Sequence, residues 1–194
     1  MGARISYVLL AAACGVIILL MYRNMELSAE TDYLQQRLVT PKVGSWIPEI
    51  VVRDIDNGVA FIGGSSNVIR VIYVMDPDCP VCEASLPGVK AIEDGLGKNS
   101  GNSLLVLSTR DAGTLRMYRE QNDLKSSRFV HSDVEIHERL GVRVVPTTLV
   151  ITADGRVSAA HVGVLDEKAV NQILVATRDE RRHRAITMPS KEKS

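Results

Sequence analysis

Two of the three cysteines, Cys79 and Cys82, lie close together in the stretch MDPDCPVCEASLP and enclose only Pro80 and Val81. A pair with this spacing can be a redox-active dithiol, a structural disulfide or one half of a metal site. The other candidate ligands and the elements around the pair bear on the choice.

A metal site would need further ligands near the pair. Apart from Cys14, the remaining candidates are four scattered histidines: His131, His137, His161 and His183. Since no two of them form a second close pair, we expect no metal, and nothing in the sequence implies an organic cofactor. A disulfide across so short a loop would constrain the unfolded chain little. The pattern therefore favours a redox-active dithiol, with a structural disulfide or a metal site as alternatives.

An apolar strand and a helix are expected to position the pair. The run NVIRVIYVMD over residues 67–76 has the length and the β-branched residues of a buried strand. A helix is expected from Cys79 to about Asp94, with a kink at Pro87. Cys79 would then lie at the helix N-terminus, where free N–H groups stabilise a thiolate. Pro80 lacks an N–H group and fits the first turn.

The rest of the body alternates between strand and helix patterns. A hairpin with an Asn-Gly turn is expected over residues 49–64. Further strands are expected over residues 103–109, 128–132, 147–152 and 156–163, and further helices over residues 112–122, 133–141 and 165–180. This order predicts an α/β fold with a mixed central sheet flanked by helices and a terminal hairpin.

Three stretches of this body resemble the thioredoxin superfamily, in particular its membrane-anchored thiol-disulfide proteins of the TlpA/ResA/CcmG type. They are VGSWIPEIVVRDIDNG, VIYVMDPDCPVCEASLP and GVRVVPTTLVITADGRVSAAHVG, and the resemblance covers Val43 to Ala176. In order, they resemble the opening strand and turn, the active-site strand with its Cys-x-x-Cys helix, and the cis-proline loop with the final hairpin. The 63 residues between Cys82 and Pro146 suit the membrane-anchored type, which has an extra central helix and strand. The resemblance implies a thioredoxin-like fold.

The resemblance also implies roles for the residues of the site. Cys79 would attack the disulfide of a partner protein, and Cys82 would resolve the mixed disulfide. Pro146, with a cis peptide bond, would hold Val145 against the sulfurs and offer backbone groups to a substrate strand. The implied substrate-binding residues are Pro80, Val81, Val145 and Pro146. Taken alone, Pro146 could equally be a proline that begins a strand.

Two positions near the dithiol depart from the family. Asp78 stands where the family usually has an aromatic residue, and its carboxylate opposes formation of a thiolate at Cys79. Tyr73 stands at the position of thioredoxin's buried acidic residue, so proton transfer to and from Cys82 would use another group. The candidates are Asp76, Glu83 or water. These departures leave the redox direction open.

The N-terminus differs in character from the body. Residues 5–22 carry no charge and lie between Arg4 and Arg23, which is typical of a short transmembrane helix. A cleaved signal peptide and a lipid anchor at Cys14 are the alternatives. We expect residues 1–24 to anchor the chain in the cytoplasmic (inner) membrane with the N-terminus inside. A polar spacer (25–42), a thioredoxin-like domain on the periplasmic side (43–180) and a charged tail (181–194) would follow.

Charge and the remaining polar residues narrow the range of partners. The sequence holds 23 Lys and Arg against 23 Asp and Glu, so nothing points to nucleic acid. The expected partners are exported thiol- or disulfide-containing proteins, a membrane redox partner and the membrane itself. His131 and His161 fit structural roles, and His137 is expected to be solvated. The basic tail is expected to be solvated, with contact to anionic lipid as the alternative.

Two functions from different classes follow. By resemblance, the chain would be a membrane-anchored thiol-disulfide oxidoreductase, acting as a reductant in the maturation of exported proteins such as c-type cytochromes. The alternative is a non-catalytic or oxidising maturation factor, because DPDCPVC also resembles a stretch of the methylamine-utilisation thioredoxin-like proteins. A peroxiredoxin-type site is not expected, since Ile72 and Asp76 occupy the places of its Pro and Thr. The client protein and the oligomeric state are not predicted.

Overall fold

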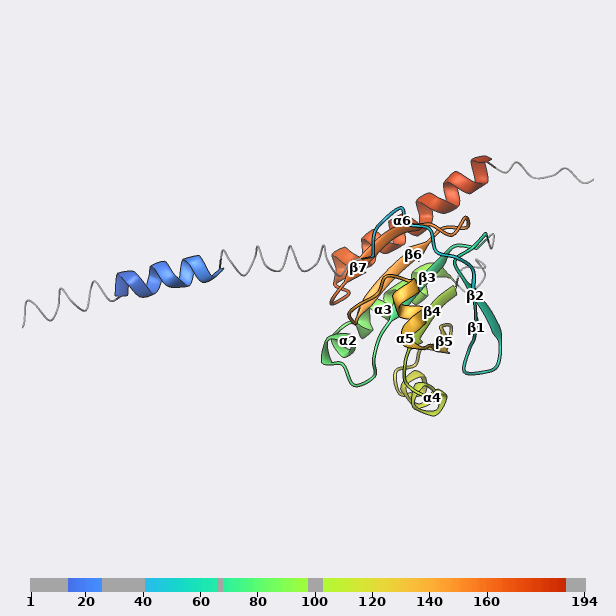
Figure 1. Ribbon diagram of the computed structural model, residues 1–194, viewed down its shortest axis with the longest axis horizontal. Coiled ribbons are helices and arrows are strands. Elements are labelled where there is room, and N and C mark those ends of the chain that lie inside the picture. Colours follow the sequence, from blue (N-terminus) through green and yellow to red (C-terminus); the bar gives the residue numbers. More distant parts are fainter. Residues whose placement is uncertain (1–13, 26–40, 66–67, 98–102, 188–194) are drawn as a thin grey trace, which may run out of the picture. The chain divides into compact units, whose positions relative to one another are not determined.

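The computed structural model describes residues 14–25, 41–65, 68–97 and 103–187. Contacts divide the chain into two units, Met1–Leu38 and Val39–Ser194, and the Cys-x-x-Cys pair lies in the second. In the first unit, residues 14–25 form a helix with exposed side chains (Figure 1). None of the helices in the described ranges is long and apolar enough to cross a membrane. The expected span over residues 5–22 and the spacer over residues 25–42 fall partly or mostly outside those ranges, so both stay predictions.

A five-stranded mixed sheet forms the centre of the second unit, in the order β5-β4-β3-β6-β7. Its strands are β3 (Arg70–Val74), β4 (Ser103–Ser108), β5 (Arg128–His131), β6 (Thr147–Ile151) and β7 (Val157–Val162). β3, β4 and β5 run parallel to one another, whereas β6 and β7 are antiparallel to their neighbours. The predicted mixed sheet is therefore confirmed.

The central strand β3 is buried along its whole length, which explains why its sequence is apolar without alternation. Val71 and Tyr73 pack into one core, whereas Ile72 and Val74 pack into the other. Helices α3 (Leu86–Leu96), α4 (Ala112–Gln121) and α6 (Glu167–Thr187) contribute to the first core. The second core holds a hairpin and residues at the end of α5 (Val134–Arg139).

This hairpin pairs β1 (Ile50–Arg53) with β2 (Val59–Ile62) as a separate two-stranded sheet. Asn57 in its turn has a left-handed backbone (φ 65°), which suits asparagine, and Gly58 follows. The predicted Asn-Gly turn is confirmed. The hairpin segment also reaches the outer edge of β5, where the Ile55 N–H donates to the Phe129 carbonyl at 2.8 Å.

Residues just before the hairpin pair with the other edge of the sheet. The Gly44 N–H donates to the carbonyl of Val157 at 2.7 Å, and the Val157 N–H donates to the carbonyl of Ser45 at 2.9 Å. Trp46 forms an antiparallel bridge with Arg156. The chain from Gly44 to Ile55 therefore contacts both outer strands.

The helix after the cysteines is interrupted where a kink was expected. It divides into α2 (Pro80–Ala84) and α3 at Ser85, with Pro87 in the first turn of α3. The buried Ser85 hydroxyl donates to the Val81 carbonyl at 2.9 Å and accepts from the Leu165 N–H at 3.2 Å. The break therefore also fixes the chain that leads into α6.

Helix α6 is longer than the sequence predicted. Asp166 caps it by accepting a hydrogen bond from the Ala169 N–H at 2.8 Å. The helix then continues to Thr187, although a helix that ends at residue 180 was expected. The predicted end of the helix is wrong, because good helix formers such as Arg and Ala allow the helix to extend past its packed face. Residues 188–194 lie outside the described ranges.

Candidate active site

The cysteine pair lies where β3 ends and α2 begins. Cys79 is the N-cap residue of α2, with an extended backbone, and its Sγ accepts a hydrogen bond from the Cys82 N–H at 3.3 Å. The sulfur therefore occupies the place of the capping oxygen that helices usually carry there. A donor aimed at the sulfur favours the thiolate over the thiol.

The two sulfurs differ in their access to solvent. Cys79 is half-buried, whereas Cys82 has an exposed fraction of 0%. Both cysteines are free thiols in this structure. Burial, together with a hydrogen bond to Cys79, raises the pKa of the Cys82 thiol to about 12. The Cys79 sulfur can therefore react with another protein. The Cys82 thiol stays protonated until its local environment changes.

The loop before β6 lies at the same end of the sheet as the dithiol. Thr147 pairs with Val74 at the last position of β3, so Pro146 lies beside the start of the active-site loop. The Val145–Pro146 peptide bond is cis, as expected. The Pro146 carbonyl accepts from the Gly163 N–H at 2.9 Å, which holds the loop against the chain after β7.

Exposed valines come from the elements that meet at this end of the sheet. Val81 is 43% exposed on α2, and Val145 is 36% exposed before the cis proline. Val144 and Val164 are also exposed. Val164 is held in place by its neighbours, because the Gly163 N–H donates to the Pro146 carbonyl and the Leu165 N–H donates to the Ser85 hydroxyl. This end of the sheet therefore exposes several apolar side chains. Pro80 and Val81 are exposed and Pro146 is buried; their substrate-binding roles stay predictions.

One side of the active-site loop is charged. Asp76 accepts hydrogen bonds from the Asp78 N–H at 2.9 Å and from Arg110 Nε at 3.1 Å. Arg110 Nη2 also donates to the Asp78 carboxylate at 2.6 Å. Burial alone would raise the pKa of Asp76, but these hydrogen bonds hold it below its usual range. Glu83, the third candidate tuning residue, is exposed on α2.

Arg110 was missed by the sequence analysis. Arg110 follows β4. Because β3 and β4 are parallel, their carboxyl ends lie at the same end of the sheet. The Met75 N–H, just past β3, donates to the Leu107 carbonyl at 2.9 Å. A charged residue directly after the next parallel strand was the signal that could have found it.

Two tyrosines, the buried Tyr73 and the half-buried Tyr118, interact with the dithiol. The hydroxyl of Tyr73, at the position of thioredoxin's acid, donates to the Cys82 carbonyl at 3.3 Å, and burial raises its pKa. Tyr118 comes from α4 and packs against Phe129. Burial, with the charges that Cys82 and Glu83 carry when ionised, raises the pKa of Tyr118 to about 12. Within the described part of the chain its buried hydroxyl has no hydrogen-bond partner.

The histidines take structural positions. His131 Nδ1 lies 2.8 Å from the Arg110 carbonyl, and His161 Nε2 lies 2.9 Å from the Val164 carbonyl. The expectation of a solvated His137 is wrong. Its ring is half-buried, Nε2 lies 2.8 Å from the hydroxyl of the buried Ser132, and burial lowers its pKa. In the described ranges, no three His, Cys, Asp or Glu side chains gather to hold a metal ion.

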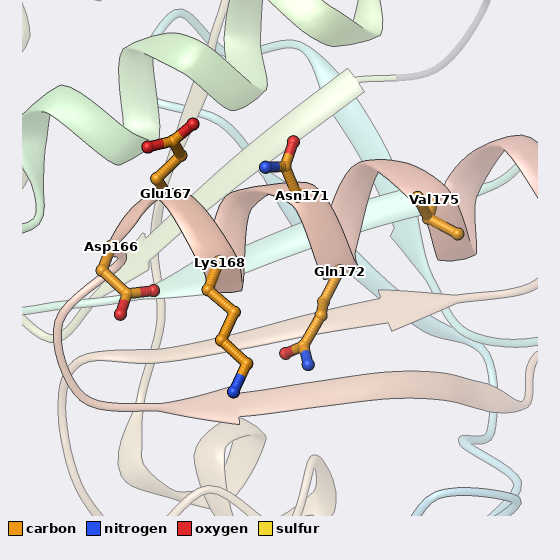
Figure 2. Close-up of a pocket in the computed structure, with 6 residues that line it drawn as sticks. All are labelled: Asp166, Glu167, Lys168, Asn171, Gln172 and Val175. Atoms are coloured by element: carbon orange, nitrogen blue, oxygen red, sulfur yellow. The ribbon is translucent and has the colours of Figure 1, made fainter.

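A pocket of about 690 Å³ lies elsewhere, along the first turns of α6 (Figure 2). Its lining consists of Asp166, Glu167, Lys168, Asn171, Gln172 and Val175. These side chains come from one helix and its cap, and neither cysteine nor the cis-proline loop is among them. We assign it no chemistry.

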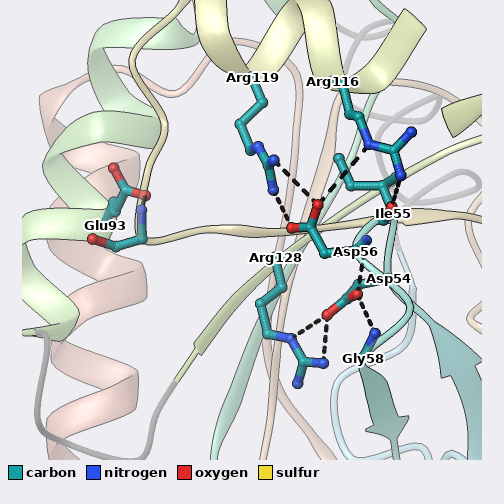
Figure 3. Close-up of polar contacts among 9 residues, drawn as sticks. Asp54, Ile55, Asp56, Gly58, Glu93, Arg116, Arg119 and Arg128 are labelled. Carbon is teal, nitrogen blue, oxygen red and sulfur yellow. Dashed lines mark hydrogen bonds and ion pairs between the residues drawn. The ribbon is translucent and has the colours of Figure 1, made fainter. Parts of the chain in front are cut away.

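A second set of ion pairs fixes the β1–β2 hairpin rather than the dithiol (Figure 3). Arg128 on β5 donates to the Asp54 carboxylate at 2.6 Å, and that side chain is only 9% exposed. Arg119 on α4 donates to Asp56 at 2.6 Å. Asp54 also accepts from the Gly58 N–H at 2.6 Å, so it closes the hairpin turn and fastens it to the sheet.

Comparison with known proteins bears on the fold and the family. Residues 62–178 match the model of a family described as a thioredoxin-like domain. None of the curated proteins compared matches the sequence. The matched range begins at the end of β2 and includes the dithiol, the cis proline and most of α6.

Solved structures share the fold at low sequence identity. A peroxiredoxin-like protein from Aquifex aeolicus is 21% identical with a TM-score of 0.56, and the match covers 70% of this chain and 87% of that one. StoA from Bacillus subtilis is 15% identical with a TM-score of 0.56, covering 67% and 96%. A thiol:disulfide interchange protein of the thioredoxin family from Chlorobium tepidum TLS is 14% identical with a TM-score of 0.58, covering 70% and 97%. The predicted thioredoxin-like fold is confirmed.

Proposed function

The chain belongs to the thioredoxin-like domain family, and on that premise we propose that it is a thiol-disulfide oxidoreductase acting on exported proteins. One observation carries the proposal. Cys79 is a half-buried helix N-cap with a donor on its sulfur, while Cys82 is fully buried with a raised pKa. A reactive outer sulfur and a protected inner sulfur are what disulfide exchange requires.

In the reductive direction the reaction has two exchange steps. The Cys79 thiolate attacks one sulfur of the partner's disulfide, so a mixed disulfide forms and the partner's other sulfur leaves as a thiolate. Cys82 then loses its proton and attacks the Cys79 sulfur, which forms the Cys79–Cys82 disulfide and releases the partner's second thiolate. Two electrons pass from the dithiol to the partner, and the two released thiolates take up protons. The oxidative direction is the reverse.

The proton of Cys82 needs an acceptor in the second step. Asp76 is poorly suited, because its hydrogen bonds from Arg110 and the Asp78 N–H keep its pKa low. Tyr73 is buried, donates to the Cys82 carbonyl and remains neutral. Glu83 or water admitted by the bound substrate would therefore take the proton.

We further propose that the chain works as a reductant in the maturation of exported proteins such as c-type cytochromes. Support comes from its resemblance to the membrane-anchored type and from the uncharged residues 5–22. The N-terminal helix would anchor it in the inner membrane with the N-terminus inside and the thioredoxin-like domain in the periplasm. A membrane redox partner would return electrons to the disulfide.

The resemblance of DPDCPVC to the methylamine-utilisation proteins favours the alternative, an oxidising or non-catalytic maturation factor. Asp78, which directly precedes Cys79, argues for the reductant instead, because a carboxylate near the thiolate destabilises the reduced form and lowers the potential.

A redox titration of the full-length protein in detergent separates these functions. We expect a reversible disulfide between Cys79 and Cys82 in glutathione buffers. A potential at or below about −270 mV supports the reductant, and one above about −180 mV supports the oxidant. If neither cysteine titrates, the oxidoreductase proposal fails and the binding factor replaces it.

Variants give an independent readout. Cys79→Ser should abolish reduction of a protein disulfide. Cys82→Ser should instead accumulate a mixed disulfide with the partner, visible on a non-reducing gel, because the resolving thiol is absent. If both variants still support assembly of the partner, the exchange chemistry is not the function.

A further inference from the structure

We propose that Arg110 is a positioning residue for the dithiol, which neutralises the carboxylates of Asp76 and Asp78 and so allows a thiolate to form at Cys79. This inference rests on the proposed function, because it concerns the reactivity of the same sulfur. No family motif and no sequence pattern singled out Arg110.

The geometry makes Arg110 a bridge between two carboxylates. Its Nε lies 3.1 Å from Asp76 Oδ2, and its Nη2 lies 2.6 Å from Asp78 Oδ2. The Asp78 N–H and the Cys79 N–H are both held by Asp76, through its carboxylate at 2.9 Å and its carbonyl at 3.1 Å. Arg110 therefore fixes the turn that presents Cys79, and it is itself fixed because its carbonyl lies 2.8 Å from His131 Nδ1.

The charge balance around Cys79 depends on this arginine. The titratable groups of the active-site loop and its helix, and those bonded to or interacting with them, are Tyr73, Asp76, Asp78, Cys82, Glu83, Arg110, Asp111, Tyr118 and His131. Within this set Arg110 is the permanent cation, and Asp76, Asp78, Glu83 and Asp111 are the anions. Without Arg110, the carboxylates of Asp76 and Asp78, which precede Cys79 in the same loop, would oppose a thiolate there without their ion-pair partner.

The ion pairs of Arg110 with Asp76 and Asp78 are better suited to adjusting the reactivity of Cys79 than to stabilising the fold. The Arg110 side chain is 44% exposed and that of Asp78 is 75% exposed. Ion pairs this exposed contribute little to the free energy of unfolding. Asp78 is the residue directly before Cys79, and charges act over a Debye length of about 8 Å at physiological ionic strength.

Arg110→Gln in the full-length protein tests the inference. We expect iodoacetamide to alkylate reduced Cys79 about two- to tenfold more slowly at pH 7, with the alkylation profile displaced to higher pH. Peptide mapping by mass spectrometry separates Cys79 from Cys14. At a pH where the thiolate is the main reduced form of Cys79, the dithiol–disulfide equilibrium should also move toward the disulfide, and a tenfold shift corresponds to about 30 mV lower potential.

Matched variants separate charge from structure. Arg119→Gln removes an arginine–aspartate pair of the same length, between α4 and Asp56, and should leave the alkylation rate unchanged. Arg110→Lys should restore only part of the rate, because a lysine does not bridge two carboxylates as a guanidinium does. The double variant Asp78→Asn/Arg110→Gln should recover much of the wild-type alkylation rate of Cys79. In 1 M salt the difference between wild type and Arg110→Gln should shrink, since screening weakens all these charges.

The outcomes for this inference are distinct from those for the proposed function. If wild type forms a reversible disulfide but Arg110→Gln matches it in rate, pH profile and potential, the positioning role is overturned while the function stands. Equal slowing by Arg119→Gln would also overturn it, because the effect would then be general. If wild type forms no reversible disulfide, the proposed function fails first.

Discussion

At the residue scale, the dithiol is defined by unequal environments for two chemically identical side chains. Cys79 is half-buried at the helix start, and Cys82 is fully buried beneath it. The buried hydroxyls of Tyr73 and Tyr118 complete the polar surroundings on the inner side, but only the first donates a hydrogen bond in the described structure. This difference makes the two tyrosines a matched pair for experiment.

Tyr73→Phe should lower the free energy of unfolding by about 1 kcal/mol, because the Cys82 carbonyl loses one of its two donors and keeps only the Ser85 N–H at 3.1 Å. Tyr118→Phe should be neutral or stabilising, since it removes a buried hydroxyl that has no partner. Urea denaturation of the reduced proteins measures both. Equal losses would show that the Tyr118 hydroxyl is satisfied in solution, and a stable Tyr73→Phe protein would show that the 3.3 Å contact contributes nothing.

At the element scale, the site depends on close approach between segments distant in sequence. Gly88 at the start of α3 lies against the backbone before α6, where a Cβ would collide with the Leu165 carbonyl. Gly95 lies about two turns further along α3, and a Cβ there would meet the side chain of Leu174. The first contact is with rigid backbone, and the second is with a side chain that can move.

Gly88→Ala should therefore cost about 1–3 kcal/mol, since the added methyl forces α3 and the Leu165 segment apart. Gly95→Ala should cost less, because Leu174 can change rotamer and alanine favours the helix. Thermal unfolding followed by circular dichroism compares the two. A Gly95→Ala protein less stable than Gly88→Ala would contradict this packing.

The ion pair of Asp54 with Arg128, which holds the β1–β2 hairpin, predicts a pH dependence of stability. Burial would raise the pKa of Asp54, but hydrogen bonds from Arg128 and the Gly58 N–H outweigh it and lower the pKa. A lowered folded-state pKa means that the stabilisation is fully present above the unfolded value, about 4, and is lost as the pH falls through the folded value. Asp54→Asn should thus cost about 1–3 kcal/mol at pH 7, and its stability should approach that of wild type in acid.

Asp123→Asn is a suitable control for that series. Asp123 pairs with Lys125 at 2.6 Å, but both side chains are well exposed. Its left-handed backbone (φ 54°) is one that asparagine also adopts readily. We expect no measurable change in stability at any pH. If the Asp54→Asn difference persisted undiminished at low pH, lost packing rather than lost charge would be its cause.

At the scale of the whole molecule, the proposed role requires that the chain stay with a membrane. The full-length protein should sediment with membranes and resist extraction at alkaline pH, because residues 5–22 supply an uncharged span. Replacing Ala13 and Val16 by lysine should release it, since a charge near mid-span costs about 2.5–3.5 kcal/mol. A soluble wild-type protein with a shortened N-terminus would instead indicate cleavage of a signal peptide.

The features that the sequence predicted are those that depend on residues close together in the chain. The strand before Cys79, the Asn57–Gly58 turn, the break near Pro87 and the proline before β6 each leave a local pattern. The missed features depend on which strands become neighbours. Arg110, Tyr118 and the Ser132–His137 contact matter only because β4, β5 and their helices pack beside β3. The extension of α6 to Thr187 was missed because a charged helix beyond its packed face looks like a tail.

The path of residues 44–55 has a consequence for solubility. This one segment bonds to the outer side of β7 at Gly44 and Ser45, and to the outer side of β5 at Ile55. A sheet with open edges offers rows of unpaired N–H and C=O groups on which further chains can grow as strands. Here a single stretch covers part of both edges, at Val157 of β7 and at Phe129 and Val130 of β5, so its release by proteolysis would expose two sites of edge-to-edge aggregation at once.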